Sequence, residues 1–322
     1  MTVQEYIESS LKNLLEPSGI SKPSDQELVE AIYRIVMSKK FRKYSASPEL
    51  TDQIRGAIKI NVEKNLPINF TFPHGAYKLW SLEEAPFPDW AELFAAMYYT
   101  KWLKPICEIY TPGVWFDYFV DDIILPKMDN ISLADVESYI TEYTKIIDFL
   151  RSYQPKNFKM TITKFEDQVS SVEDFYESLD ERTNALTKTN PTFSEEDLQA
   201  VELNANPTPE QKKDPKWREK IRTIHDAYIG LKRDIGYYYK EDKIPVFSQP
   251  LPSGKFIIVG TTKTSIAKFW VGIGALKKMG DSFIEYILSP KQIEKTKFSK
   301  EKIAIEGLEG RNFEKIRIIT DS

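Results

Sequence analysis

Hydrophobic residues recur at every third or fourth position in the first part of the chain. This spacing runs through residues 3–15 and 25–38, and a Pro-Ser-Asp sequence precedes the second stretch, as is typical of a helix start. A third helix is expected over residues 48–64. We therefore predict that residues 1–65 form an N-terminal helical cover.

The spacing then changes to a period of two. Residues 66–72 alternate apolar and polar side chains up to a Pro-His-Gly break, which predicts a strand. The patterns that follow predict a helix beginning at Asp89, a strand pair over 110–122, a helix over 132–151, a strand over 158–163 and a helix over 171–186. This alternation predicts the α/β class: a Rossmann-like mixed sheet with helices on both faces, with its core in residues 66–186.

The chain becomes polar over residues 187–215, a segment that is rich in proline. We expect a linker, an insertion or a mobile lid there. Residues 216–322 are expected to form a C-terminal α+β portion that completes the site. In this portion the patterns predict a helix over 217–236, strands over 245–247, 256–259, 303–305 and 316–319, and an amphipathic helix over 266–276.

The composition is that of a globular protein and argues against some partners. Of the 322 residues, 41% are hydrophobic and 29% are charged. The net charge of −4 gives no general attraction to a phosphate backbone, so nucleic acid is not expected as a partner. The most basic run is residues 39–43. Such a run is more often a solvated loop, and the alternative is that it holds an anionic substrate group.

Few residues are available for disulfides or metal sites. The single cysteine cannot form an intramolecular disulfide, and two histidines give no zinc-site spacing, so no metal is expected. A GxGxxG motif is absent, so no nicotinamide cofactor is expected either. Because no apolar run reaches about 18 residues and the start is not signal-like, we expect a cytoplasmic protein without membrane contact. The oligomeric state is left open.

Polar groups follow the strand predicted over 66–72. Its end delivers His74, Gly75 and Lys78 to the carboxyl edge of the sheet, which is where open α/β sheets bind ligands. His74 and Lys78 are therefore candidate catalytic residues. The alternative is that Lys78 is an exposed turn residue and that His74 caps the strand.

Four carboxylates are relevant to acid–base chemistry, and Glu92 and Asp121 are the candidate catalytic residues among them. Asp89 and Glu92 have the spacing of a capping box, which explains Glu92 about as well as a role in binding an ammonium group or transferring a proton does. Asp121 and Asp122 follow an apolar strand. Adjacent side chains on a strand face opposite ways, so we expect at most one of these two to point into the site.

A second candidate region is the turn at residues 260–265, with the sequence GTTKTS. A strand-to-helix turn with several hydroxyl groups and a lysine resembles places where backbone N–H groups hold a phosphate. Candidate substrate-binding residues are Thr262, Lys263 and Ser265 in this turn, with Trp270 lining the pocket and Tyr110 stacking on an aromatic amino acid. Ordinary helix capping and core packing are the alternatives.

Four stretches resemble the isonitrile synthases, a family that includes bacterial tyrosine and tryptophan isonitrile synthases and fungal dityrosine-precursor enzymes. They are LPINFTFPHGAYK, PDWAELF, IYTPGVWF and VDDII. The resemblance places Lys78 on the family's lysine, Glu92 on its helix-start glutamate and Asp121 on its aspartate. It implies that the amine of an amino acid condenses with the ketone of ribulose 5-phosphate, after which the adduct loses protons and fragments.

The resemblance therefore implies an enzyme that converts tyrosine or tryptophan to an isonitrile, with the amino acid and the phosphosugar as partners and without a cofactor. We expect Lys78 and Lys263 to converge on the phosphate. One alternative is a relative that acts on another phosphosugar and amine. Another is a non-catalytic protein that binds a small molecule.

Overall fold

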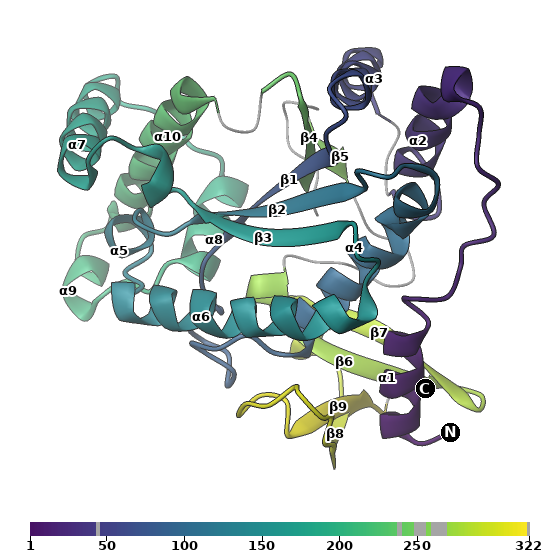
Figure 1. The fold of residues 1–322 in the computed structure, drawn as a ribbon. Coiled ribbons are helices and arrows are strands. Elements are labelled where there is room, and N and C mark those ends of the chain that lie inside the picture. Colours follow the sequence, from purple (N-terminus) through teal and green to yellow (C-terminus); the bar gives the residue numbers. More distant parts are fainter. Residues whose placement is uncertain (43–45, 237–239, 248–255, 259–268, 321–322) are drawn as a thin grey trace.

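The structure is a computed structural model that describes residues 1–42, 46–236, 240–247, 256–258 and 269–320 (Figure 1). Five strands form a sheet in the order β3-β2-β1-β4-β5, and every neighbouring pair is parallel. The strands are β1 (Ile68–Gly75), β2 (Val114–Asp121), β3 (Phe158–Lys164), β4 (Lys243–Phe247) and β5 (Ile257–Ile258). This order is that of the Rossmann fold, so the predicted α/β class is confirmed.

Helices cover both faces of this sheet. In Figure 1, α4 and α6 lie below the sheet, and α3, α7 and α10 lie above it. The longer helices are α1 (Val3–Lys12), α2 (Leu28–Val36), α3 (Pro48–Glu63), α4 (Trp90–Ile109), α6 (Leu133–Leu150), α7 (Val172–Lys188), α8 (Glu195–Asn204) and α10 (Trp217–Ile235). The shorter helices are α5 (Leu125–Met128), α9 (Pro209–Lys212) and α11 (Pro290–Ile293).

A second sheet lies beyond α4 at the bottom of Figure 1. Its strands run in the order β7-β6-β9-β8, with β6 and β9 parallel and the other pairs antiparallel. They are β6 (Ile273–Met279), β7 (Ser282–Leu288), β8 (Phe298–Lys302) and β9 (Lys315–Ile319). Helix α4 contacts strands of both sheets and so forms a layer between them.

The sequence of α4 suits this central place. Fourteen of its 20 residues are buried, and a helix that is apolar around most of its circumference must be covered on more than one side. Two aromatic residues illustrate this: Tyr99 stacks on Phe116 of β2 with ring centroids 4.7 Å apart, whereas the indole N–H of Trp90 donates to the Lys315 carbonyl of β9 over 2.9 Å. The helix therefore holds the two sheets together.

Several predicted elements need correction. Residues 110–122 contain the single strand β2 rather than a strand pair. Residues 303–305 do not form a strand, because β8 ends at Lys302. The helix predicted over 266–276 is wrong in its described part: residues 269–271 form a 3-10 turn and β6 follows. Gly274 in β6 lies so close to Trp90 that only a glycine fits there, and spacing along the chain does not reveal that contact.

The segment 187–215, for which a linker, an insertion or a mobile lid was expected, contains helices. These are α8 and α9, and Val201 and Ala205 pack with Ile221 of α10. The indole N–H of Trp80 donates to the Ala205 carbonyl over 3.0 Å. The first sheet contains strands from both sides of the expected boundary at residue 215, because β4 and β5 come from the C-terminal portion.

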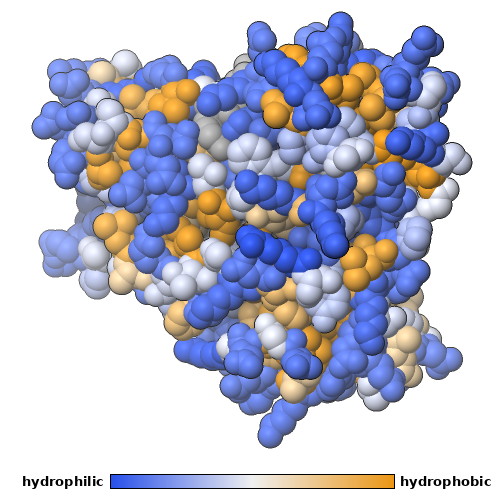
Figure 2. Space-filling model, in the orientation of Figure 1, coloured by the Kyte–Doolittle hydropathy of each residue, from blue (hydrophilic) through white to orange (hydrophobic). Residues whose placement is uncertain are grey.

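The surface carries no extended apolar face in the view of Figure 2, where hydrophobic residues form separate groups among hydrophilic ones. In the described ranges, none of the helices combines the length and the apolar composition needed to cross a bilayer.

The contact between α4 and β6 gives a first prediction. A Cβ atom at Gly274 would lie 2.4 Å from the Cβ of Trp90 and 2.5 Å from the Ala91 nitrogen, so Gly274→Ala should lower the free energy of unfolding by about 2 kcal/mol. Gly56→Ala is the matched control. Gly56 lies inside α3 with nothing within 4 Å of the added Cβ, so this change should stabilise the protein by roughly 0.5–1 kcal/mol. Urea unfolding of both variants measures the difference, and equal effects would contradict the close approach.

Candidate functional site

A lysine without solvent exposure lies beyond the end of β1. The Lys78 ammonium donates to Asp89 Oδ1 at 2.7 Å and to Glu92 Oε2 and Oε1 at 2.9 and 3.1 Å. It also donates to the Phe269 carbonyl at 3.1 Å. We call Lys78, Asp89, Glu92 and Tyr139 the buried lysine cluster, in which the Tyr139 hydroxyl donates to Glu92 Oε1 at 3.0 Å.

The two carboxylates of this cluster are fixed by the start of α4. The Asp89 N–H donates to Glu92 Oε2 at 2.8 Å and the Ala91 N–H donates to Asp89 Oδ1 at 2.9 Å, as in a capping box. The second Asp89 oxygen accepts a hydrogen bond from the Gly274 N–H of β6 at 3.1 Å. Glu92 is therefore a capping residue that also pairs with Lys78, and its expected role in catalysis stays a prediction.

Burial controls the protonation of this cluster. Burial raises the pKa of Glu92 to about 8, although the positive charge of Lys78 opposes the shift. Burial by itself lowers the pKa of Lys78, but Asp89 and Glu92 together raise it above its ordinary value. A buried carboxyl group with a raised pKa beside a lysine has the properties of a general acid.

His74, the next candidate, is the penultimate residue of β1 and is 2% exposed. Its Nδ1–H donates to the Gly75 carbonyl at 2.7 Å, so Nε2 carries the lone pair. Nε2 is buried and has no hydrogen-bond partner among the described residues. Burial lowers the pKa of His74 to about 4, so the imidazole is neutral at physiological pH and can accept a proton.

An aromatic box surrounds His74. The ring centroids of Phe269, Trp270 and Tyr118 lie 5.1, 5.4 and 5.6 Å from that of His74, and Tyr143 lies at 5.8 Å. The hydroxyl groups of Tyr118 and Tyr143 are buried and interact with each other. His74 Nε2 is therefore the atom of the box that lacks a partner among the described residues, which is unusual in a protein core, where polar groups are normally hydrogen-bonded.

Tyr118, Tyr139 and Tyr143 were not among the residues chosen from the sequence. Tyr139 and Tyr143 are four positions apart on the buried face of α6. Nothing in their spacing indicates that this face contacts Glu92 and His74.

Asp121 is on the other face of the first sheet. It pairs with Gly75 in the β1–β2 register, so its side chain points away from the face that carries His74. There Asp121 Oδ1 accepts hydrogen bonds from the Tyr228 hydroxyl and the Lys232 ammonium of α10, each at 2.6 Å. The sheet therefore separates Asp121 from the buried lysine cluster.

The side chain of Asp122 is held by a backbone hydrogen bond. Its Oδ1 accepts the Glu166 N–H at 3.1 Å, and burial raises its pKa to about 6. The two neighbouring carboxylates thus differ in their surroundings, as the alternation of strand side chains implies.

The structure separates some candidates that the sequence grouped together. The Tyr110 hydroxyl donates to the Leu66 and Asn61 carbonyls at 2.8 and 3.1 Å, beside the amino end of β1 and therefore at the opposite edge of the sheet from His74. Trp270, in contrast, lies in the aromatic box. Thr262, Lys263 and Ser265 lie outside the described residues, so their convergence with Lys78 stays a prediction.

The expected phosphate contact of Lys78 does not fit its surroundings. An ammonium has three N–H groups, and those of Lys78 already face four oxygen acceptors in a site without solvent exposure. In the described part of the chain, no group of three or more His, Cys, Asp or Glu side chains could hold a metal ion.

His74 lies at the carboxyl end of β1. This end is next to the point where the strand order of the first sheet reverses, between β1 and β4. Ligands of Rossmann-type sheets bind outside the carboxyl ends of the strands at this switch point. The fold and the site therefore define a Rossmann-like α/β protein with a buried acid–base cluster at the switch point.

Comparisons with known proteins support the fold. No family model matches the chain, and no curated protein matches its sequence. The crystal structure of the PvcA protein from Pseudomonas aeruginosa is similar, with a TM-score of 0.60 and 14% sequence identity. The similarity covers 87% of this chain and 97% of PvcA, so it extends over most of the fold rather than one motif.

The buried lysine cluster gives a prediction about stability. Lys78→Met removes the cation from two buried carboxyl groups and should lower the free energy of unfolding by about 3–5 kcal/mol. Lys59→Met is the control: the Lys59–Glu63 pair is 66% and 60% exposed, so its loss should cost about 0.5 kcal/mol or less. Chemical denaturation measures both, and a Lys78 variant as stable as the control would show that the cluster does not hold the fold.

His74 predicts a pH dependence. Its pKa is lowered from 6.5 to about 4 in the folded protein, so the unfolded chain binds more protons between these values and stability is lost as the pH falls through them. The loss is roughly 3 kcal/mol for this shift. His74→Gln should flatten the curve in this window.

Unfolding curves from pH 4 to pH 7 test this expectation. Asp122 acts in the opposite direction, because its raised pKa of about 6 favours the folded state at lower pH. The difference between wild type and His74→Gln removes that contribution. A difference that does not change with pH would contradict a neutral, desolvated His74.

Proposed function

We propose that this chain is an isonitrile synthase-like enzyme that converts the amine of an amino acid, tyrosine or tryptophan, to an isonitrile with ribulose 5-phosphate as the carbon donor. The observation that carries the proposal is the contact between Lys78 and Glu92. The resemblance to isonitrile synthases picks out these two residues in separate stretches of sequence, and they meet in one ion pair at the end of β1.

The chemistry of this reaction needs both an acid and a base. Condensation of an amine with a ketone expels water, for which a general acid supplies a proton, and the later loss of protons needs a base. Glu92, with its pKa raised to about 8, suits the acid, and the neutral Nε2 of His74 suits the base. Lys78 then keeps Glu92 in place rather than contacting the phosphate.

The aromatic box supports an aromatic amino acid as substrate. Phe269, Trp270, Tyr118 and Tyr143 surround His74, and the two tyrosine hydroxyls can accept or donate hydrogen bonds to a polar substrate group. The similarity in fold to PvcA agrees with this proposal, and at 14% identity it supports the fold alone.

A second function is favoured by the burial of the site. Lys78 and Glu92 are without solvent exposure and satisfy each other's hydrogen bonds, as in a structural ion pair. A non-catalytic protein that binds a small molecule would show ligand-induced stabilisation without turnover. A thermal-shift series with tyrosine, tryptophan and ribulose 5-phosphate, run beside the activity assay, separates the two.

The activity assay is direct. Purified protein is incubated with tyrosine or tryptophan and ribulose 5-phosphate, and the product is analysed by mass spectrometry. We expect a product in which the amine has gained one carbon and lost two hydrogens. Heavy carbon at the ketone position of the sugar should appear in that product, and unlabelled product or no product with either amino acid would exclude this reaction.

Glu92→Gln tests the role of the cluster in catalysis. It removes the acid while keeping the size of the side chain, so kcat should fall by about 100-fold or more. Glu63→Gln on the exposed side of α3 is the control and should leave kcat unchanged. Full activity of a folded Glu92→Gln protein would assign this residue to capping alone.

A further inference from the structure

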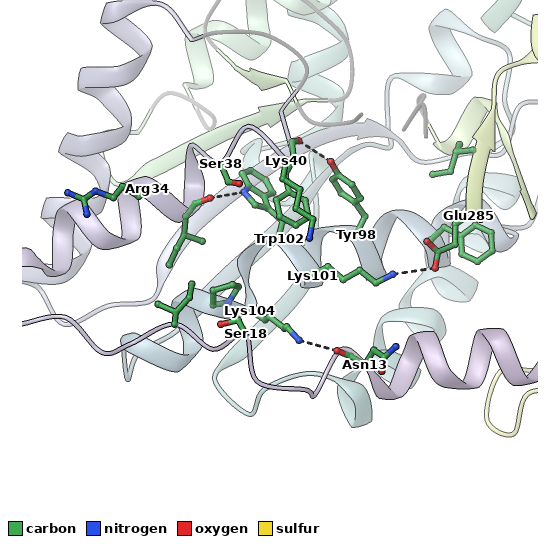
Figure 3. Close-up of a pocket in the computed structure, with 16 residues that line it drawn as sticks. Asn13, Ser18, Arg34, Ser38, Lys40, Tyr98, Lys101, Trp102, Lys104 and Glu285 are labelled. Carbon is green, nitrogen blue, oxygen red and sulfur yellow. Dashed lines mark hydrogen bonds and ion pairs between the residues drawn. The ribbon is translucent and has the colours of Figure 1, made fainter. Parts of the chain in front are cut away.

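A cavity of about 760 Å³ lies between the N-terminal helical cover, α4 and β7 (Figure 3). We call it the basic pocket. Its lining residues in α4 include Phe94, Tyr98 and Lys101, whereas Glu92 contacts Tyr139 of α6 from the other side of the helix. The basic pocket and the buried lysine cluster are therefore two separate sites on opposite sides of α4.

The charge of the basic pocket is opposite to that of the chain. The residues that line it include four bases, Arg34, Lys40, Lys101 and Lys104, and one acid, Glu285, although the whole chain carries a net charge of −4. Glu285 is already paired with Lys101 at 3.3 Å. A concave surface with one sign of charge concentrates ligands of the opposite sign.

Lys40 is the cation most available to a ligand. It belongs to the basic run 39–43 that the sequence singled out, and it has no carboxylate partner within the described residues. Figure 3 shows Lys40 directed into the pocket, whereas the Arg34 guanidinium points away from it. Lys104, in contrast, donates to the Asn13 and Glu16 carbonyls.

The aromatic wall of the pocket is held in place by hydrogen bonds. The Tyr98 hydroxyl donates to the Phe41 carbonyl at 3.0 Å, and the Trp102 indole N–H donates to the Ile35 carbonyl at 3.3 Å. The rings of Phe41 and Tyr98 pack edge to face, with their centroids 5.3 Å apart. These bonds join α4 to the end of α2, so this wall exists before any ligand binds.

The opposite wall is fixed as well. Lys104 holds the Asn13 carbonyl at 3.0 Å, and the Ser18 N–H donates to Glu108 Oε1 at 2.8 Å, so the chain that follows α1 is tied to α4. A pre-formed concave site of this size, largely apolar with a few polar groups, has the usual properties of a site for a small organic ligand.

We propose that the basic pocket binds a small amphipathic anion, an alkyl or aromatic body with one carboxylate or phosphate, which lies on the Tyr98–Trp102 wall with its charge between Lys40 and Lys101. A neutral apolar ligand would leave the Lys40 ammonium without an anionic partner, and an inorganic anion would leave the apolar wall uncovered. This site goes beyond the proposed function and does not depend on it.

Isothermal titration calorimetry with three probes tests the site. Decanoate has both an apolar chain and a carboxylate, 1-decanol lacks the charge, and inorganic phosphate lacks the chain. We expect decanoate to bind with one site per chain. 1-Decanol, which lacks the carboxylate, and phosphate, which lacks the alkyl chain, should each bind at least about tenfold more weakly.

Variants assign the binding to this pocket. Lys40→Ala and Lys101→Ala should each weaken decanoate binding by about tenfold, as expected for the loss of one charged hydrogen bond. Lys39→Ala is the matched control, because Lys39 is in the same basic run, is exposed and does not line the pocket. It should leave the affinity unchanged.

Three results of the calorimetry would overturn the proposal. They are equal binding of decanoate and 1-decanol, an unchanged affinity in the folded Lys40→Ala and Lys101→Ala proteins, and the absence of decanoate binding. Binding to vesicles of anionic lipid without binding to monomeric decanoate would also overturn it, since the lysines would then act as a membrane-facing surface.

Discussion

The fold depends on the burial of one positive charge. An ammonium group without solvent exposure is stable only where carboxylates and carbonyls replace its water, and Lys78 finds them in Asp89, Glu92 and the Phe269 carbonyl. These partners belong to the start of α4 and to the segment before β6. Asp89 also accepts the Gly274 N–H, so the same carboxylate joins the first sheet, the central helix and the second sheet.

Much of the first sheet could be predicted from local patterns. The alternation over residues 66–72 gave β1, and the i, i+3, i+4 spacing after Asp89 gave α4 with its capping box. The parallel arrangement follows from strands separated by helices. The placement of His74 at the carboxyl end of β1 could also be predicted, because it requires only the strand's direction and its end.

Contacts between distant segments could not be predicted in this way. Residues 269–279 are apolar enough for a helix, and the closeness of Gly274 to Trp90, which makes them a turn and a strand, is a tertiary contact. The burial of Lys78 was missed for the same reason, since a lysine after a strand is normally exposed. Tyr118 and Tyr143 likewise acquire their meaning only when β2 and α6 pack around His74.

The raised pKa of Glu92 is the central claim, because a carboxyl group with a raised pKa can supply the acid for the proposed reaction. Carbon-13 NMR of glutamate side-chain carboxyls, with the Glu92 signal assigned by its loss in Glu92→Gln, measures this titration directly. The account predicts a midpoint well above the ordinary range, at about 8. A midpoint near 4.5 would show an ionised Glu92 at neutral pH and would contradict the account.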